Sequence, residues 1–533
     1  DFSGSFDGLG HSISNLLLDG NSLFPAVARP ASATEGSKAG TIANLNLVDP
    51  VFNAVKDAHG ILVGQIRGGV IRNVHVYGAK VNTEVDAAGL VGGVYLGSVV
   101  EECSVNADIV GSEDSSLGGI ALNTRTGGII RACAFNGTIA GGQTLGGIVA
   151  DFGHADDVLE NCHVKASISG KNTIGGIAGS SAHGTIRFCH VEGDITASEA
   201  PRWGGGPKTG GIVGDLAAFP GDPSGEEEVE PNIAIEGCYV NLSSLTFTGE
   251  PSSSEEYPGQ NDTMHRIVGS SAANGYPEYL GEDSDYNPIW GNPAAPEAGL
   301  KNNYAVNTLD VVNSDIADAT GTTEGMSVDP YETGMGFFTE LGWLYGFDAE
   351  NPWSYTGDQL HPSLYFEGGL LVIDPEEATI KVDDEITLTV SCKGGSITED
   401  DLGGFTMEMS DESVLETLEM GMVGEDIVLS FKAIKEGNVK LTVGLKGKTV
   451  ESNITVKSAA GITDAVADGS AISFDGTVVT APACDIDVYT TMGVRVLSAR
   501  DSADLSRLGG GVFIVTARPV NGGAASTLKV HVK

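Results

Sequence analysis

A short motif recurs along the first half of the chain at intervals of about 29 residues, and this repeat constrains the fold more than any other feature. Each copy places an apolar residue after one suited to a turn. The copies are Asn15-Leu16, Asn44-Leu45, Asn73-Val74, Glu102-Cys103, Ala132-Cys133, Asn161-Cys162, Phe188-Cys189, Gly237-Cys238 and a divergent Asn303-Tyr304. A unit this short cannot bury its own apolar face, so neighbouring units must stack and share one core.

A second apolar column runs in phase with the first, and in most copies a glycine precedes it. It reads Leu62-Val63-Gly64, Leu90-Val91-Gly92, Ile120-Ala121-Leu122, Ile148-Val149-Ala150, Ile177-Ala178-Gly179 and Ile212-Val213-Gly214. Each unit therefore holds at least two short strands separated by polar turns, in a chain with 75 glycines and only 6% aromatic residues. We predict a parallel β-helix of about nine coils, with strands of successive coils about 4.8 Å apart.

The seven cysteines are better explained by this repeat than by a disulfide framework, because their number is odd and most lie in the first column. Alternation along a strand directs Cys162 and Val164 inward and His163 outward. We therefore predict a buried ladder of free thiols, and asparagines that bond the turn backbone beside it. His163 and His190 share the outward column. They could bind one metal ion together, but we expect a pair of solvated side chains.

Several further motifs carry a family resemblance. The opening Phe2-x-Gly4-x-Phe6-Asp7-Gly8 with His11-x-Ile13, and the recurrent Gly89 to Gly92 and Gly210 to Gly214, resemble GLUG-motif proteins. The stretches Asn303-Tyr304-Ala305-Val306, Leu341-Gly342-Trp343, Trp353 and Pro362-x-Leu364 resemble the way such arrays close. The resemblance covers residues 1–368 and implies a right-handed parallel β-helix of a bacterial surface adhesin or surface-anchored protein.

The rest of the chain changes character twice. Residues 221–300, rich in Gly, Pro, Ser and acids, read as loops inserted into the last coils. Residues 369–458 alternate in hydrophobicity and resemble a bacterial Ig-like β-sandwich. Residues 459–533 predict a small C-terminal β-sandwich that resembles the sorting or anchoring domains of secreted Bacteroidetes proteins.

Charge and hydropathy limit the partners. A net charge of −43 disfavours nucleic acid and anionic membranes, and could favour cations such as calcium. No apolar run is long enough for a transmembrane helix. The chain opens inside the repeat pattern without Met, so we take it as a mature or truncated form. We expect a secreted or bacterial cell-surface monomer that needs no cofactor, is not an enzyme, and binds a glycan or a host or other extracellular protein.

Candidate ligand-binding residues are aromatic side chains in the insertions, since exposed rings stack on sugars or anchor protein contacts. They are Trp203, Tyr257, Tyr276, Tyr279, Tyr286 and Trp290, which could instead form a hydrophobic cap on the end of the β-helix. The spacing Asp283-x-Asp285-x-Asn287 begins like a calcium loop, but Pro288 stands where a glycine should turn the chain.

Two alternatives to a binding protein stay open. One is a polysaccharide lyase or glycoside hydrolase, in which Asp151 and Asp215 would supply carboxylates from one column, two coils apart. His154, Asp156 and Asp157 adjoin that pair. The competing interpretation is that the carboxylates lie at coil corners and have no catalytic role. The other alternative is a structural stalk that binds nothing.

Overall fold

The chain was analysed as a computed structural model, which separates into two compact units. One contains residues 1–370 with 392–396, and the other residues 371–391 with 397–533. The described residues are 2–28, 40–55, 59–154, 156–181, 183–199, 207–216, 233–249, 264–271, 278–282, 288–291, 299–309, 311, 321–355, 360–445, 448–458, 472–522 and 525–532.

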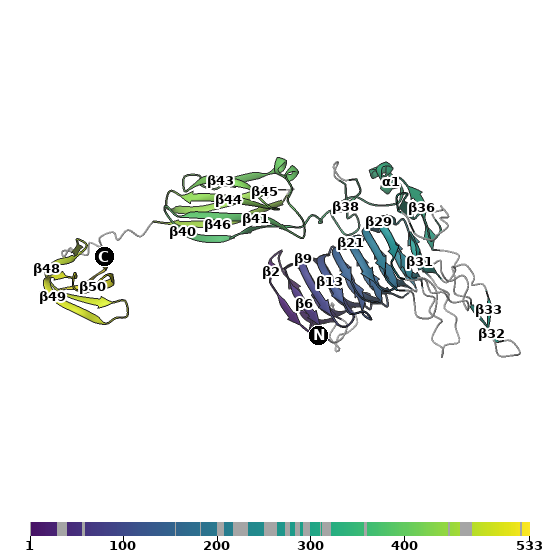
Figure 1. The fold of residues 1–533 in the computed structure, drawn as a ribbon, viewed down its shortest axis with the longest axis horizontal. Coiled ribbons are helices and arrows are strands. Elements are labelled where there is room, and N and C mark those ends of the chain that lie inside the picture. The colour runs from purple at the N-terminus through teal and green to yellow at the C-terminus, as the bar shows by residue number, and fades with distance from the viewer. Residues whose placement is uncertain are drawn as a thin grey trace. The chain divides into compact units, whose positions relative to one another are not determined.

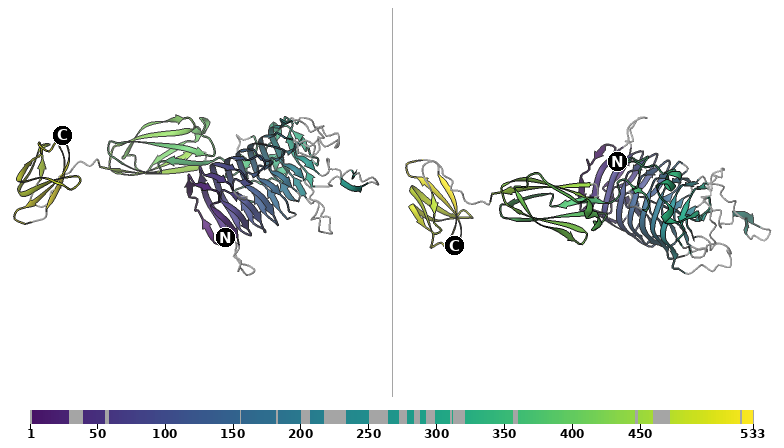
Figure 2. Two further views of the ribbon diagram at one scale, coloured as in Figure 1. Left: turned by 60° about the horizontal axis from the view of Figure 1, so that its bottom comes forward. Right: turned by 90° about the horizontal axis from the view of Figure 1, so that it is seen from above.

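The first unit is a parallel β-helix, as the repeat predicts (Figure 1). Its coils contribute strands to three parallel sheets, and Figure 2 shows these strands stacked coil upon coil. The largest sheet holds two strands from most coils: β1 (Ser5–Asp7), β2 (Ser12–Ser14), β3 (Leu17–Asp19), β5 (Thr41–Val48), β6 (Val51–Ala54), β9 (Val70–Thr83), β12 (Val99–Glu101), β13 (Ser104–Gly111), β16 (Ile129–Arg131), β17 (Ala134–Ala140), β20 (Val158–Glu160), β21 (His163–Gly170), β24 (Gly184–Arg187), β25 (His190–Ala197), β28 (Ile233–Glu236), β29 (Tyr239–Phe247), β34 (Leu300–Lys301), β35 (Tyr304–Val306) and β36 (Met326–Val328).

The other two sheets of the β-helix carry the second apolar column and its glycines. The seven-stranded sheet contains β7 (His59–Gly60), β10 (Ala87–Ala88), β14 (Ser116–Gly118), β18 (Thr144–Gly146), β22 (Thr173–Gly175), β26 (Lys208–Gly210) and β30 (Met264–His265). The eight-stranded sheet contains β4 (Phe24–Ala28), β8 (Val63–Arg67), β11 (Val91–Tyr95), β15 (Ala121–Arg125), β19 (Val149–Phe152), β23 (Ala178–Ser181), β27 (Val213–Leu216) and β31 (Val268–Ser271).

Left-handed corners bend each coil within the largest sheet, inside β5 and β9 and between the paired strands of the later coils. The turn residue of the repeat has a positive φ in every coil from Asn44 to Asn302, including Glu102 and Phe188. This conformation costs little for Asn and Gly but is uncommon for other residues. The prediction that the asparagine side chains bond turn backbone holds for Asn303, whose Nδ2 donates to the carbonyl of Ile235 and whose Oδ1 accepts from the amide of Cys238. It is wrong for Asn73, whose Nδ2 donates to Oδ1 of Asn44 on the preceding coil at 2.8 Å.

The observed strand register differs from the predicted sequence repeat at both ends of the β-helix. Ser14 pairs with Val48, so Asn15 lies beside Asp49 rather than in the corner with Asn44. The first coil has extra residues at its turn, which shift the later part of the coil. Tyr304 pairs with Tyr239. The last left-handed corner is therefore Asn302, and Asn303 takes the place of the cysteine.

The predicted cysteine ladder is confirmed. Cys103, Cys133, Cys162, Cys189 and Cys238 are free thiols with no exposed surface. The inward positions two residues later are also buried, at Val105, Phe135, Val164, Val191 and Val240. Burial raises the pKa of the thiols of Cys133, Cys162, Cys189 and Cys238.

The remaining elements of this unit lie outside the three parallel sheets. An antiparallel pair, β32 (Glu278–Glu282) and β33 (Pro288–Gly291), lies in the inserted region. A segment after the last coil holds a 3-10 helix η1 (Pro330–Glu332), α1 (Met335–Glu340), β37 (Trp353–Ser354) and β38 (Ser363–Leu364). Among the described residues, no helix has the length and hydropathy needed to cross a bilayer.

The strands from Leu370 to Lys457 form an Ig-like β-sandwich of two four-stranded sheets. One contains β39 (Leu370–Asp374), β41 (Glu385–Lys393), β44 (Asp426–Ala433) and β43 (Leu415–Val423); the other contains β40 (Glu377–Lys381), β46 (Lys448–Lys457), β45 (Gly437–Leu445) and β42 (Thr406–Met409), with η2 (Asp400–Gly404) between strands. Alternate residues of β44 are buried, as a sheet with one face on a core requires.

The C-terminal strands pair into one five-stranded sheet with its own core. They are β47 (Ser473–Phe474), β48 (Val478–Thr490), β49 (Arg495–Asp504), β50 (Gly511–Pro519) and β51 (Ser526–Val532). Ile486, Val488 and Val515 are fully buried in that core.

Candidate functional site

Residues 329–367, which we call the capping segment, cover one outward column of the β-helix. The column runs through His75, Ser104, Ala134, His163, His190, Tyr239 and Tyr304, which pair from coil to coil. The ring of Phe337 lies 5.0 Å from that of Tyr304, and the ring of Phe366 lies 5.3 Å from that of His75. The capping segment therefore runs back along the coils towards the N-terminus.

Two stacked tryptophans anchor the capping segment to the left-handed corners. The rings of Trp343 and Trp353 are 4.1 Å apart, and both side chains are fully buried. Trp343 Nε1 donates to the carbonyl of Gly237 at 2.8 Å, and Trp353 Nε1 donates to Oδ1 of Asn161 at 3.1 Å. These bonds satisfy both indole N–H groups, which burial would otherwise leave unpaired.

The expectation of a solvated histidine pair is wrong, because the capping segment covers it. His163 is 4% exposed and His190 is fully buried. Their imidazole rings stack with centroids 4.6 Å apart and planes 9° from parallel. Both side chains do point away from the core, as the alternation predicts, but the surface they reach is already occupied.

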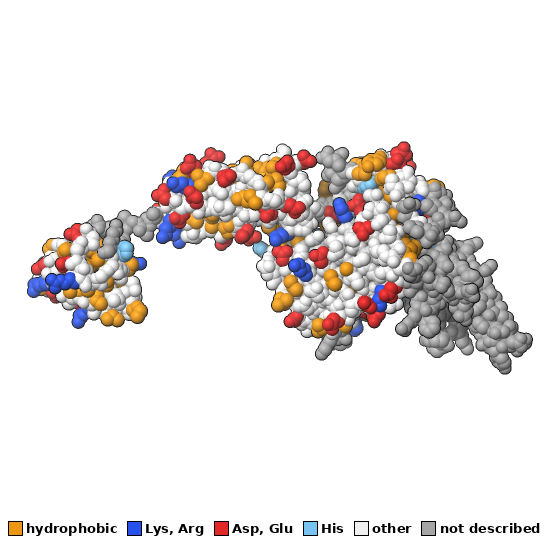
Figure 3. All heavy atoms as spheres, viewed as in Figure 1, with side chains coloured by type: hydrophobic (Ala, Val, Ile, Leu, Met, Phe, Trp, Pro, Cys, Tyr) orange, Lys and Arg blue, Asp and Glu red, His pale blue; other side chains and the backbone are white. Residues whose placement is uncertain are grey.

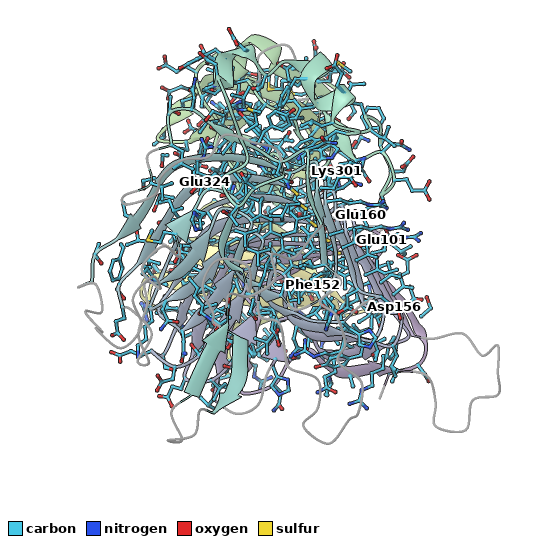
Figure 4. All side chains as sticks on the ribbon, turned by 90° about the vertical axis from the view of Figure 1, so that its right-hand side faces the viewer. Glu101, Phe152, Asp156, Glu160, Lys301 and Glu324 are labelled. Carbon is cyan, nitrogen blue, oxygen red and sulfur yellow. The ribbon has the colours of Figure 1, made fainter. Side chains whose placement is uncertain are left out.

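A ladder of alternating charges runs beside this column, and the sequence analysis missed it. Its members pair in register and are Arg72, Glu101, Arg131, Glu160, Arg187, Glu236 and Lys301. Figure 4 labels Glu101, Glu160 and Lys301 on one side of the β-helix. The carboxylate of Glu101, 2% exposed, contacts both Arg72 and Arg131. The signal was present in the sequence two residues before each apolar member of the first column from Val74 to Cys238.

The carboxylates proposed for catalysis lie in one column, as predicted, but each is neutralised by its own cation. Asp151 and Asp215 both pair with Ser180 of the coil between them. Asp151 forms an ion pair with Arg125, and the Nζ of Lys208 lies 2.6 Å from Asp215. Each of the two carboxylates is thus engaged by a cation of its own coil or a neighbouring one.

The loop beside Asp151 is held by a structural carboxylate. Asp157 is fully buried and accepts hydrogen bonds from the amides of Gly127, Gly128 and His154 and from the hydroxyl of Thr124. These bonds use its acceptor capacity to fix a turn, so Asp157 reads as a corner residue rather than a catalytic one. Asp156 lies at the edge of the β-helix in Figure 4.

Most other predicted site residues lie outside the described residues. This holds for Trp203, Tyr257, Tyr276 and Tyr286, and for the calcium candidates Asp283, Asp285 and Asn287. Tyr279 and Trp290 face each other in the β32–β33 backbone ladder, but their side chains are not among the parts described.

The capping segment itself presents apolar side chains to solvent. Tyr331 and Phe347 are each 82% exposed, and Leu344 and Met335 are about half exposed. In Figure 3, hydrophobic side chains gather near α1, which belongs to this segment. Exposed aromatics of this kind are common in binding surfaces.

Comparison with known proteins adds little about function. No family model matches the chain, and no curated protein matches it. Among solved structures, domains 4 and 5 of the S-layer protein SbsC match with 15% identity and a TM-score of 0.15, over 18% of this chain and 50% of that one. The Yersinia pseudotuberculosis adhesin InvE matches with 12% identity and a TM-score of 0.14, over 31% and 58%. The chain thus spans half of the first of these structures, and TM-scores so low carry no argument.

Proposed function

We propose that this protein is a secreted or cell-surface binding protein of the adhesin type, which recognises a glycan or an extracellular protein. The observation that carries the proposal is the exposure of Tyr331 and Phe347 on the capping segment. A rigid β-helix holds the segment in place through buried tryptophans, so the exposed rings are presented without a large cost in ordering.

The alternative function, a polysaccharide-active enzyme, has less support, because Asp151 and Asp215 are both engaged in ion pairs.

The test is a glycan and matrix-protein array probed with the full chain, with and without calcium, beside the variants Phe347→Ala and Tyr331→Ala. Leu9→Ala is the matched control, since Leu9 is 74% exposed on the first coil, away from the capping segment in sequence. Selective binding that both aromatic variants lose and Leu9→Ala keeps supports the proposal. No selective binding by the wild-type chain would favour the structural stalk.

A further inference from the structure

We propose that His163, His190 and Glu192 form a site for a divalent transition-metal ion, with zinc as the best-matched metal. Their ligand atoms all lie within 4.8 Å of one another. The Nε2 of His190 is 3.5 Å from Oε1 of Glu192, and the Nε2 of His163 is 3.9 Å from Oε2. Two imidazoles and one carboxylate are a common zinc set, and bonds near 2.1 Å would place tetrahedral ligands about 3.3 Å apart. Because the two imidazoles stack nearly parallel, both rings must tilt about χ2 for their in-plane lone pairs to converge on one ion.

Both imidazoles are held with the correct nitrogen free. The Nδ1 of His163 lies 2.8 and 2.9 Å from the two carboxylate oxygens of Glu367, and the Nδ1 of His190 lies 3.3 Å from the carbonyl of Pro362. Each Nδ1–H therefore has an acceptor, which leaves a lone pair on each Nε2. A histidine that donates one ring N–H to a carboxylate or carbonyl is the usual arrangement behind a zinc-bound imidazole.

The two Nε2 atoms are buried and, among the described residues, have no hydrogen-bond partner. Leaving a polar atom buried and unpaired costs free energy, so two such atoms side by side need an explanation. A metal between them and Glu192 satisfies both at once.

The charges of the groups around the site favour a bound cation. Glu192 and Glu367 supply negative charge, and Asn241 Nδ2 lies 3.5 Å from Glu192 and 3.2 Å from the Nδ1 of His361. The one cation nearby in the described part of the site, Lys165, lies 3.8 Å from Glu192 but is 63% exposed and can turn to solvent.

The metal would fasten the capping segment to the β-helix. The three ligands come from β21 and β25, whereas Glu367 and Pro362, which orient the imidazoles, belong to the capping segment. Binding is expected to raise the melting temperature of this unit, because an ion that binds only the folded state stabilises it. This role is independent of the proposed binding function.

The test is metal binding by the full chain without a histidine tag, after dialysis against a chelator. We expect one Zn²⁺ per chain and, with Co²⁺, the visible absorption of a four-coordinate ion. His190→Gln and Glu192→Gln should each weaken binding by more than about tenfold, and Glu367→Gln by about 10- to 100-fold. His75→Gln is the matched control, because His75 lies in the same covered column with both ring nitrogens hydrogen-bonded.

Circular dichroism and melting curves would confirm that each variant is folded. No stoichiometric binding by the folded wild-type chain would overturn the proposal. So would Zn²⁺ affinity unchanged in His190→Gln and Glu192→Gln, or reduced equally in His75→Gln. Weak binding of many ions without the four-coordinate Co²⁺ spectrum would mean that the acidic surface alone binds metal, and would also overturn it.

Discussion

Glycine in the second column serves close backbone contact between coils. A Cβ on Gly147 would lie 2.1 Å from the carbonyl oxygen of Gly176, and one on Gly176 would lie equally close to Gly211. The stack of glycines ends at Arg266, whose side chain is buried beside Glu324 and donates to the carbonyl of Gly325. A side chain is thus accommodated where the regular stacking stops.

We predict that Gly147→Ala destabilises the β-helix by about 3 kcal/mol, because the backbone it meets cannot move without shifting a coil. Urea unfolding followed by tryptophan fluorescence measures this, since all four tryptophans lie before residue 370. Gly336→Ala is the control, as it meets nothing within 4 Å. Equal unfolding midpoints for the two variants would contradict the stacking explanation.

The buried thiols make stability depend on pH in a known direction. The pKa values of Cys133, Cys162, Cys189 and Cys238 are raised by burial, so the folded chain keeps protons that the unfolded chain releases. Their stabilisation is complete below the usual thiol pKa of about 8.5 and is lost as the pH rises above it, by roughly 1 kcal/mol per pH unit for each thiol.

Comparing Cys162→Ala with the wild type isolates this effect. Urea unfolding from pH 7.5 to 10 should show a shallower loss of stability for the variant, because one titrating thiol is gone. Parallel curves for the two proteins would mean that the thiols do not titrate on unfolding as described.

Among the elements, the charge ladder sets the relation between neighbouring coils. Each ion pair of the ladder joins oppositely charged residues of neighbouring coils. If the pairing skipped one coil, residues of like charge would lie side by side. Because Glu101 is 2% exposed, its two arginine partners are needed to offset the desolvation of its carboxylate.

The double variant Arg72→Met with Arg131→Met should therefore cost about 3 to 5 kcal/mol, since it leaves Glu101 buried and unpaired. Lys301→Met should cost less than about 1 kcal/mol, because Glu236 is 37% exposed and water replaces the lost partner. Thermal unfolding of both variants gives the comparison; similar losses would show that burial of Glu101 does not decide the effect.

The sequence predicted those elements whose pattern is local. Period-two alternation identified the inward cysteines and valines. It could not locate the capping segment, because the contact between His163 and Glu367 joins residues 204 apart in the chain. The buried state of His163 and His190 follows from that contact, so their site was also beyond the repeat pattern.

At the scale of the whole molecule, the chain contains a β-helix, an Ig-like sandwich and a small C-terminal β-domain, each with its own strands. The copy at Asn303 is out of register, which shows why a sequence repeat predicts strand pairing least well at its ends. The closing coil contains insertions, and Tyr304 pairs with Tyr239 rather than at the position that the repeat predicts. We propose that binding involves the capping segment, which presents exposed aromatic rings.

The most direct test of that assignment is the affinity of a ligand selected on the array for three proteins: wild type, Phe347→Ala and Leu9→Ala. Loss of an exposed aromatic anchor at an interface typically costs 2 kcal/mol or more, or about 30-fold in affinity. The account predicts that loss for Phe347→Ala and less than about twofold for Leu9→Ala. Unchanged affinity in Phe347→Ala and Tyr331→Ala would contradict it and place the binding surface elsewhere.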